Sequence, residues 1–598
     1  MSLTEKTAAL AKQWLEWDYN SATHAEIQAL VDAKDEKELV KRLHNRIDFG
    51  TAGLRGAMKA GFSNMNVLTV VQASQGLAVY VEKVVPEAKK RGVIVGYDGR
   101  HNSKTFAAHT AATFAHQGFH VYLFSHLVPT PYVAYAVLLK KAAVGIMVTA
   151  SHNPKDDNGY KVYWENGPQI IEPHDRGIKA CIEENLVPWK FPGGSAEAAL
   201  AGEYKSLVSD PLHDVVSTYF PLITDWCFHK SENGARALDI TYTAMHGVGA
   251  APVKLAFDAF GLKPYIPTKE QVEPDADFPT VAFPNPEEGK GALKLAMATA
   301  DAHNSPVIIA NDPDADRLAA AEKLADGTWK IFTGNELGIL FASWAWSSYL
   351  KKNPGVDRSK VLVLNSTVSS KMLRALAHKE GFEFQEALTG FKWLGNIACE
   401  AKKQGRIPLF AFEEAIGYMV GDACWDKDGV RAAAIFAEMA SSLYAAGSTV
   451  AGELKRLQNE LGYYPTNNRY FFCYDPSKLP VIFGEIRNGG NYTDKCGRFE
   501  ISGIRDLTAP GFDSTTADKK PTLPVSSGTQ MITFTFANGG VATLRGSGTE
   551  PKLKYYVELA GKAGEDPAKV EAELAELTEA IIKQFLQPEK FGLEKPRD

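Results

Sequence analysis

The chain alternates between two spacings of apolar residues over most of its length. Short apolar runs, which are typical of buried strands, are followed by segments in which apolar residues recur at helical spacing. Residues 93–98, 119–124 and 144–150 predict strands of this kind, and between the first two Ser103 can cap a helix that Gly118 ends. This order of elements predicts an α/β unit.

The same order recurs twice further along the chain. Each round finishes a strand with a polar loop, and such loops are where α/β sheets bind ligands. The second round predicts strands at 237–243 and 306–310 and helices at 250–259 and 289–300, and the third predicts strands at 361–365 and 408–412 and helices at 370–381 and near 394–404. We infer three related α/β domains, although the rounds share a pattern rather than residues.

After about residue 460 the pattern changes to short alternating stretches at 530–536 and 541–545, followed by an amphipathic helix over 566–586. This predicts a separate α+β domain. The expected fold class is therefore α/β, with three similar domains in which a mixed sheet lies between helices, and a C-terminal α+β domain. The expected domain boundaries are 1–215, 216–325, 326–458 and 459–598.

Length and charge fit this division and exclude several kinds of partner. At roughly 150 residues per domain, 598 residues correspond to about four domains. The 65 basic and 71 acidic residues give a net charge of −6, so bulk charge attracts neither nucleic acid nor an anionic membrane. The chain begins without the apolar core of a signal peptide, and the run at 336–350 is too short and too polar to span a bilayer. We expect a cytoplasmic protein with no membrane or nucleic-acid partner.

The cysteines add no metal site or covalent framework. All six lack C-x-x-C spacing, which argues against a zinc ribbon and against a disulfide scaffold. We expect reduced thiols.

The segment NDPDADR at 311–317 follows an apolar strand and places Asp312, Asp314 and Asp316 within five residues. Oxygen ligands on a tight loop suit a hard cation such as Mg²⁺, which keeps open positions for a phosphate. The alternative is an acidic turn that binds no metal. An EF-hand does not fit, because the loop lacks the downstream glutamate that a calcium loop requires.

The segment RGSGTEPKLKYY at 545–556 has the composition of an anion-binding loop. Its glycines free the backbone to turn N–H groups inward, and Arg545 can make a bidentate contact to phosphate, with Lys552 and Lys554 adding local charge. The alternative is an ordinary hairpin turn.

The segment VTASHNPKDDNGYK at 148–161 allows two interpretations. Ser and Asn can cap a turn that Pro stiffens and Asn-Gly reverses. Ser151 can instead be a nucleophile or phosphate carrier, but a hydroxyl needs a base or a metal, which Lys161 or His152 could assist. We rank His152 below Lys161, because a lone exposed histidine is more often solvated.

Four shorter segments place a basic or carboxylate group on glycine-rich backbone, which suits the gathering of a sugar phosphate. Each alone is more often a loop or a helix start. They are GTAGLRG at 50–56, GYDGR at 96–100, TGFKWLG at 389–395 and DKDG at 426–429.

Four longer motifs, in order along the chain, point to one family. They are TASHNP at 149–154, DPDADR at 312–317, EEAIG at 413–417 and RGSGTEP at 545–551. Together they closely resemble the α-D-phosphohexomutases, and the resemblance covers nearly the whole chain. It implies four domains around a central cleft, three of them with one shared α/β fold, and it implies sugar phosphates as ligands.

The resemblance also implies roles for single residues. Ser151 would be the phosphorylated serine, Lys161 would match the general acid/base position, and Arg55 would match the N-terminal active-site arginine. Mg²⁺ would be held by Asp312, Asp314 and Asp316 together with the Ser151 phosphate. The residues implied to contact substrate are Arg317 and Lys427, Thr389 and Glu413 at the sugar hydroxyls, and Arg545, Ser547, Gly548, Thr549 and Lys554 at the phosphate that is not transferred.

One departure from the family pattern concerns the sugar. Many members carry a serine two residues after the sugar-loop glutamate, whereas Glu413 is followed at that position by Ala415. Because a missing hydrogen-bond partner weakens discrimination for a sugar hydroxyl, a strict preference for glucose phosphate is not expected. The segments at 158–170 and 412–418 look most like the branch that contains phosphopentomutases and glucose-1,6-bisphosphate synthases.

The implied reaction interconverts a sugar 1-phosphate and its terminal-phosphate isomer, with glucose or ribose as the sugar. It runs through a phosphorylated Ser151 and a sugar bisphosphate, which is both intermediate and activator. The alternatives are a glucose-1,6-bisphosphate synthase, a metal-dependent sugar phosphatase or kinase-like phosphotransferase, and a non-catalytic scaffold. The chain has no G-x-x-x-x-G-K-[ST] motif, and the intact Ser151, aspartates and Lys161 weigh against a scaffold. We expect a monomer or a weak dimer.

Overall fold

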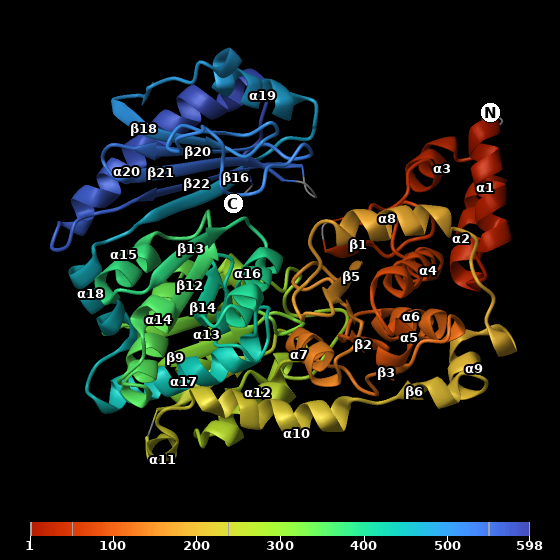
Figure 1. Cartoon of the computed structure of the whole chain (residues 1–598), viewed down its shortest axis with the longest axis horizontal. Coiled ribbons are helices and arrows are strands. Elements are labelled where there is room, and N and C mark those ends of the chain that lie inside the picture. Colours follow the sequence, from red (N-terminus) through yellow and green to blue (C-terminus); the bar gives the residue numbers. More distant parts are fainter. Residues whose placement is uncertain (1–2, 51, 237, 548–550, 597–598) are drawn as a thin grey trace. The chain divides into compact units, whose positions relative to one another are not determined.

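The computed structural model describes residues 3–596 except 51, 237 and 548–550 (Figure 1). Its contacts divide the chain into two compact units. Unit 1 comprises Met1–Leu364 and Gly390–Val450, and unit 2 comprises Asn365–Thr389 and Ala451–Asp598. Each unit is described by itself below.

Unit 1 begins with three helices that the sequence patterns did not predict. They are α1 (Glu5–Trp17), α2 (Ser21–Asp32) and α3 (Glu36–Leu43). Trp14 is fully buried and packs edge-on against Phe62, with ring centroids 5.1 Å apart. The three helices therefore have a small apolar core of their own, which they share with the turn that follows the first strand.

The first sheet of unit 1 has the strand order β1-β5-β4-β2-β3-β6. Its strands β2, β3, β4 and β6 are parallel, while β5 runs antiparallel to both β4 and β1. The helices α4 (Val67–Val84), α6 (Ser103–His116) and α8 (His174–Glu184) share one apolar core with this sheet. The strands are β1 (Gly53–Ala57), β2 (Val93–Tyr97), β3 (Val121–Leu123), β4 (Val144–Val148), β5 (Asp157–Trp164) and β6 (Val208–Ser209).

The second sheet of unit 1 has the order β11-β10-β9-β7-β8. The strand β7 runs parallel to β8 and β9, and β10 runs antiparallel to its neighbours β9 and β11. Its strands and flanking helices are β7 (Ile240–Thr243), α12 (Ala250–Phe260), β8 (Ile266–Pro267), α13 (Lys290–His303), β9 (Val307–Asn311), β10 (Leu318–Lys323) and β11 (Trp329–Ile331). The strand β9 ends directly before the three aspartates.

The third sheet has the order β13-β12-β14-β15, and the boundary between the two units runs through β12. A capping box formed by Thr333 and Glu336 starts α14, the first helix of this region. The elements are α14 (Gly334–Lys352), β12 (Val361–Ser366), α15 (Met372–Glu380), β13 (Glu383–Ala387), α16 (Phe391–Lys403), β14 (Ile407–Glu413), β15 (Gly417–Val420) and α17 (Gly429–Ala445).

The C-terminal sheet lies in unit 2 and has the order β16-β22-β21-β20-β18-β17, with β19 paired to β18. Alternate residues of β22 such as Leu553, Tyr555 and Val557 join the apolar core with the helices, so Lys552 and Lys554 project from the opposite face. The elements are α18 (Val450–Leu461), β16 (Thr466–Phe472), α19 (Lys478–Arg487), β17 (Lys495–Cys496), β18 (Phe499–Asp506), β19 (Phe512–Asp513), β20 (Met531–Phe536), β21 (Gly540–Gly546), β22 (Lys552–Leu559) and α20 (Pro567–Ile581).

The expected fold class is confirmed: three α/β regions with mixed sheets precede a C-terminal sheet region. The predicted cap at Ser103 is wrong. Asn102 holds the N-cap position of α6 without a side-chain cap bond, and the Ser103 hydroxyl donates to Asp98 at 2.7 Å instead. All six cysteines are free. Among the described residues, no helix is both long and apolar enough to cross a membrane.

Candidate active site

Ser151 lies three residues past the end of β4 in a left-handed backbone conformation, with φ of 54°. A serine rarely adopts this conformation unless its surroundings hold it there. Its side chain is buried, and Oγ donates a hydrogen bond of 2.9 Å to Asp312 Oδ2. The predicted phosphate carrier and the first predicted metal ligand, 161 residues apart in sequence, are therefore in direct contact.

Thr149 holds the backbone N–H of Ser151, and Arg100 in the loop that follows β2 holds its carbonyl. The Ser151 N–H donates to Thr149 Oγ1 at 2.8 Å, and the Thr149 hydroxyl donates to Asp98 Oδ2 at 2.7 Å. The Ser151 carbonyl accepts from Arg100 Nη2 at 2.5 Å. Asp98, Arg100 and Thr149 are all buried.

Arg100 also binds the rest of the serine loop. Its guanidinium donates to the carbonyls of Asn153 at 2.6 Å, Pro154 at 2.9 Å and Asp157 at 3.3 Å. A planar guanidinium with five donors suits such a fan of acceptors, and a lysine does not. The loop is thus fixed by one buried side chain from a neighbouring strand end.

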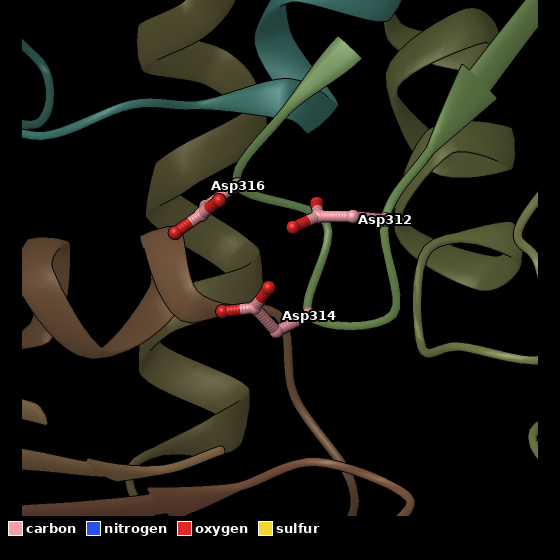
Figure 2. A group of neighbouring side chains, drawn as sticks. All are labelled: Asp312, Asp314 and Asp316. Atoms are coloured by element: carbon pink, nitrogen blue, oxygen red, sulfur yellow. The ribbon is translucent and has the colours of Figure 1, made fainter. Parts of the chain in front are cut away.

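Asp312, Asp314 and Asp316 lie close together on the loop between β9 and β10 (Figure 2). All three are buried, and one carboxylate oxygen of each lies within 4.8 Å of the others. Asp314 Oδ1 and Asp316 Oδ1 are buried and accept no hydrogen bond from the described residues. Buried carboxylate oxygens left free in one cluster fit a hard divalent cation, so the donor set suits Mg²⁺.

Basic side chains surround this carboxylate cluster. Lys161 Nζ lies 2.7 Å from both Asp314 Oδ2 and Asp316 Oδ2. Lys427 Nζ lies 3.5 Å from Asp316, and Arg317 Nε lies 3.9 Å from it. Each buried carboxylate thus has a cation nearby, which offsets the cost of removing these charges from water.

The balance of burial and charge sets the protonation states. Burial, together with Asp314 and Asp316, raises the pKa of Asp312 well above its usual value. Burial also opposes ionisation of Asp316, but Lys161, Lys427 and Arg317 outweigh it and lower the pKa of Asp316. Burial alone would lower the pKa of Lys161, but Asp314 and Asp316 raise it, so Lys161 is a cation here.

One further contact to Asp314 comes from the start of α7 (Thr130–Lys140). The Thr130 hydroxyl donates to Asp314 Oδ2 at 2.5 Å, and the Thr130 N–H donates to the Asp314 carbonyl at 2.9 Å. Thr130 therefore fixes both the backbone and the side chain of the middle aspartate.

Arg55 contacts the serine loop, and His152 lies within it. Arg55, on β1, pairs across the sheet with Gly159 of β5 and donates to Asn153 Oδ1 at 3.2 Å. Burial, with Arg317 and Arg55, lowers the pKa of His152 well below its usual value, so His152 is neutral. The structure therefore brings Arg55 to the loop that carries Ser151.

The loop predicted to contact the sugar follows β14. Glu413 ends this strand and accepts a hydrogen bond of 2.6 Å from the Gly390 N–H. Arg317 Nη1 donates to the Ala415 carbonyl at 3.1 Å, and the Arg317 N–H donates to Asp312 Oδ1 at 3.0 Å. Arg317 therefore joins the loop of Glu413 to the loop of the three aspartates.

The remaining predicted residues lie in unit 2. Arg545 on β21 and Lys554 on β22 are direct cross-strand partners, and the Arg545 guanidinium donates to the Thr389 hydroxyl. The Ser547 N–H donates to the Lys552 carbonyl at 2.9 Å. The predictions for Gly548 and Thr549 fall outside the described residues.

Sequence patterns missed several residues that hold this site. Asp98 and Arg100 stood in a noted segment, GYDGR, but the pattern gave no hint of what they bind. Thr130 had no signal at all, since threonine at a helix start is common. Each acts through a contact to a residue far away in the chain.

Comparison with known proteins finds the same family for most of the chain as the four sequence motifs indicated. Residues 46–187, 217–326 and 333–459 match the family models for phosphoglucomutase/phosphomannomutase alpha/beta/alpha domains I, II and III. The chain is 49% identical to a phosphopentomutase of Mus musculus, covering 97% of this chain and 95% of that protein. It is 48% identical to a glucose 1,6-bisphosphate synthase of Pongo abelii, covering 97% and 94%.

A solved structure agrees on the fold. The open form of parafusin, a phosphoglucomutase from Paramecium, aligns with a TM-score of 0.64 and 18% identity. The alignment covers 92% of this chain and 96% of that one.

Proposed function

Because the chain belongs to the phosphoglucomutase/phosphomannomutase family, we propose that it interconverts a sugar 1-phosphate and its terminal-phosphate isomer. The class of enzyme is a phosphotransferase mutase. The full-length similarity to a phosphopentomutase supports ribose 1-phosphate and ribose 5-phosphate as substrates beside the glucose phosphates. The observation that carries the proposal is the contact of Ser151 Oγ with the buried cluster of three aspartates.

Ser151 is the phosphate carrier of this proposal. Asp312, Asp314 and Asp316 would hold Mg²⁺ together with the Ser151 phosphate, and the ion would offset negative charge on the transferred group. Lys161, Lys427 and Arg317 supply further positive charge at the same cluster. A phosphoserine carries a charge of about −1.5 to −2, so an incoming oxygen nucleophile needs this compensation.

Lys161 is the proposed general acid/base. When the phosphoryl group passes to the sugar, the sugar hydroxyl loses a proton as its oxygen bonds to phosphorus. Ser151 Oγ gains a proton as its own bond to phosphorus breaks, so one group that relays a proton is sufficient. The cationic state of Lys161 supports the donating half of this exchange.

Recognition of the sugar phosphate is assigned to two sets of residues. In unit 1, Arg55, Arg317 and Lys427 supply positive charge and Glu413 supplies an acceptor for sugar hydroxyls. In unit 2, we propose that Thr389 contacts the sugar and that the loop after β21 binds the phosphate that stays in place. The residues proposed for that phosphate are Arg545, Ser547, Gly548, Thr549 and Lys554. The four domain boundaries and a cytoplasmic location stay part of this proposal.

A second candidate function is glucose 1,6-bisphosphate synthesis, which the 48% identity to such an enzyme favours. The two reactions share the phosphoserine step. They differ in their phosphoryl balance, because a synthase gains one phosphoryl group per sugar from another donor, whereas a mutase gains none.

An isomerisation assay separates these functions. The protein is incubated with Mg²⁺, a trace of glucose 1,6-bisphosphate, and ribose 1-phosphate, glucose 1-phosphate or mannose 1-phosphate, and kcat/KM is compared. We expect the 5- or 6-phosphate isomer, with ribose phosphate turned over at least as efficiently as glucose phosphate. Free phosphate without isomer would assign a phosphatase, and a net gain of bisphosphate with an added phosphoryl donor would assign a synthase.

A further inference from the structure

The strand β5 carries two buried polar side chains on one face. Lys161 and Tyr163 are two residues apart and so project from the same side, while Tyr160, Val162 and Trp164 join the apolar core on the other. Lys161 reaches Asp314 and Asp316. Tyr163 reaches a different loop, which lies before α17 and contains Asp426.

Asp426 is buried and its two carboxylate oxygens face different partners. Oδ2 accepts hydrogen bonds from the Tyr163 hydroxyl at 2.8 Å and from Gln169 Nε2 at 3.2 Å. Oδ1 accepts from the Lys427 N–H at 2.8 Å and lies 3.3 Å from Lys427 Nζ. Asp426 therefore connects β5 directly to Lys427.

The side chain of Lys427 is enclosed. It is 7% exposed, and its Nζ lies 3.5 Å from Asp316 Oδ2 and 5.3 Å from the centre of the Phe391 ring. A Cβ atom at Gly417 would lie 2.3 Å from Lys427 Cδ, so only glycine at this position leaves room for the Lys427 side chain as it lies here. If this buried ammonium loses one of the two carboxylates that lie within 4 Å of it, solvent does not compensate the loss.

We propose that Tyr163 and Asp426 are positioning residues that hold Lys427 Nζ against Asp316. This rests on the proposed function, in which Lys427 contacts the sugar phosphate. The strand β5 then carries Lys161 and, through Tyr163 and Asp426, also sets the position of Lys427. One strand thereby fixes the spacing of both lysines around the aspartate cluster. Tyr163 acts through Asp426 and does not itself touch substrate.

A matched pair of variants on β5 tests this proposal. Tyr163→Phe removes the hydroxyl bound to Asp426, and Tyr160→Phe removes an equally buried hydroxyl that lies 3.0 Å from Ser74 Oγ on the core face. Both variants should lower Tm by similar amounts. We expect Tyr163→Phe alone to lower kcat/KM for the sugar phosphate, by about ten-fold, mainly through KM. Equal kinetic loss in both variants, or none in Tyr163→Phe, would overturn the proposal.

A double-mutant cycle then separates positioning from a general loss of packing. If Tyr163 acts through Lys427, Tyr163→Phe should change kcat/KM in the wild type but not in a Lys427→Met background, while still lowering Tm in both. Additive kinetic losses would contradict the proposal. Asp426→Asn is the second variant if Tyr163→Phe does not fold, and it should show the same non-additivity.

A crystal structure of Tyr163→Phe tests the positioning role independently of the proposed function. If the wild type isomerises no sugar phosphate, the proposed function fails, yet Lys427 Nζ should still move away from Asp316 in the variant. An unchanged Lys427 would overturn the positioning role whatever the enzyme's substrate is.

Discussion

The candidate site residues of unit 1 and those of unit 2 differ in how their charges are arranged. In unit 1, Lys161 lies between Asp314 and Asp316 in a buried cluster of alternating sign. In unit 2, Arg545 and Lys554 face each other across half-buried strands as a like-charged pair. Two cations on one face of a sheet attract an anion, as their proposed role at the phosphate requires.

The difference indicates two tasks. Buried charges of alternating sign hold reactive groups in one geometry, which serves the chemical step. Half-exposed charges of one sign attract an anion and tolerate its movement, which serves binding. Variants of the aspartate cluster and of the serine loop in unit 1 should therefore act mainly on kcat, and variants of the proposed phosphate-binding residues in unit 2 mainly on KM.

The largest effect is expected from the aspartate cluster. Asp314→Asn removes a charge from the predicted metal ligands and should lower kcat roughly a thousand-fold, because a bound cation contributes several kcal/mol to such transfers. Mg²⁺ should raise the Tm of the wild type and not that of the variant. Asp326→Asn, at an exposed turn after β10, is the control and should keep both responses. A variant that keeps full activity with Mg²⁺ would contradict the metal assignment.

A smaller effect is expected from the serine loop. Arg100→Lys cannot bind the four carbonyls that Arg100 holds, and the resulting shift of Ser151 should lower kcat about a hundred-fold with little change in KM. Arg91→Lys is the matched control, because Arg91 binds the carbonyls of Lys141 and Ala142 at the other end of β4. Equal kinetic losses in the two variants would show a general weakening of the sheet instead.

A still smaller effect, and on a different parameter, is expected in unit 2. Arg545→Ala should raise KM for the sugar phosphate about ten-fold with a lesser change in kcat, since it removes a charge-assisted contact to phosphate. Arg498→Ala, which breaks an exposed ion pair with Glu576 in the same unit, should leave KM unchanged. A loss confined to kcat would contradict the division of tasks.

The smallest kinetic effect is expected at Glu386, a charge of unit 2 whose side chain is 11% exposed and which has a structural role. Burial raises the pKa of Glu386, but Lys371, Arg505 and Arg374 outweigh it and lower the pKa to about 2. The folded pKa of Glu386 lies below its unfolded value of about 4.3. The ion pairs therefore stabilise the fold at neutral pH, and this stabilisation is lost as the pH falls from about 4.3 towards 2. Glu386→Gln should cost about 3 kcal/mol of unfolding free energy at pH 7 and leave KM unchanged.

Denaturant unfolding at several pH values checks this prediction. The difference between the wild type and Glu386→Gln should shrink once the pH falls below about 4.3. Glu576→Gln is the control, because its ion pair is exposed and should contribute little at any pH. A difference that stays constant down to low pH would contradict the assigned cause.

The sequence singled out the candidate reactive residues because each stands in a dense local pattern. Asp312, Asp314 and Asp316 alternate after an apolar strand, and Ser151 follows another. Their contact could be anticipated only through the family resemblance, since no local rule joins residues 161 positions apart. The strands that carry them were found for the same local reason: apolar runs mark buried strands.

The supporting residues were not predicted, because their role depends on tertiary contacts. Arg100 binds backbone carbonyls more than 50 positions away, and Tyr163 binds a carboxylate 263 positions away. The Ser103 cap failed for a related reason: Asp98 competes for the hydroxyl that would have capped α6. The helices of residues 5–43 were missed although the side chains of Thr4, Asn20 and Asp35 cap their starts, which is a local signal.

The most direct test of the account is to map the phosphoryl group on the enzyme. The protein is incubated with glucose 1,6-bisphosphate and Mg²⁺, digested, and its peptides are analysed by mass spectrometry, with Ser151→Ala treated in parallel. We predict one phosphopeptide, with the group on Ser151, that disappears from the variant and loses its phosphate when a sugar monophosphate is added. A phosphoryl group on another residue, or an unmodified Ser151 in an enzyme that turns over sugar phosphates, would contradict the account.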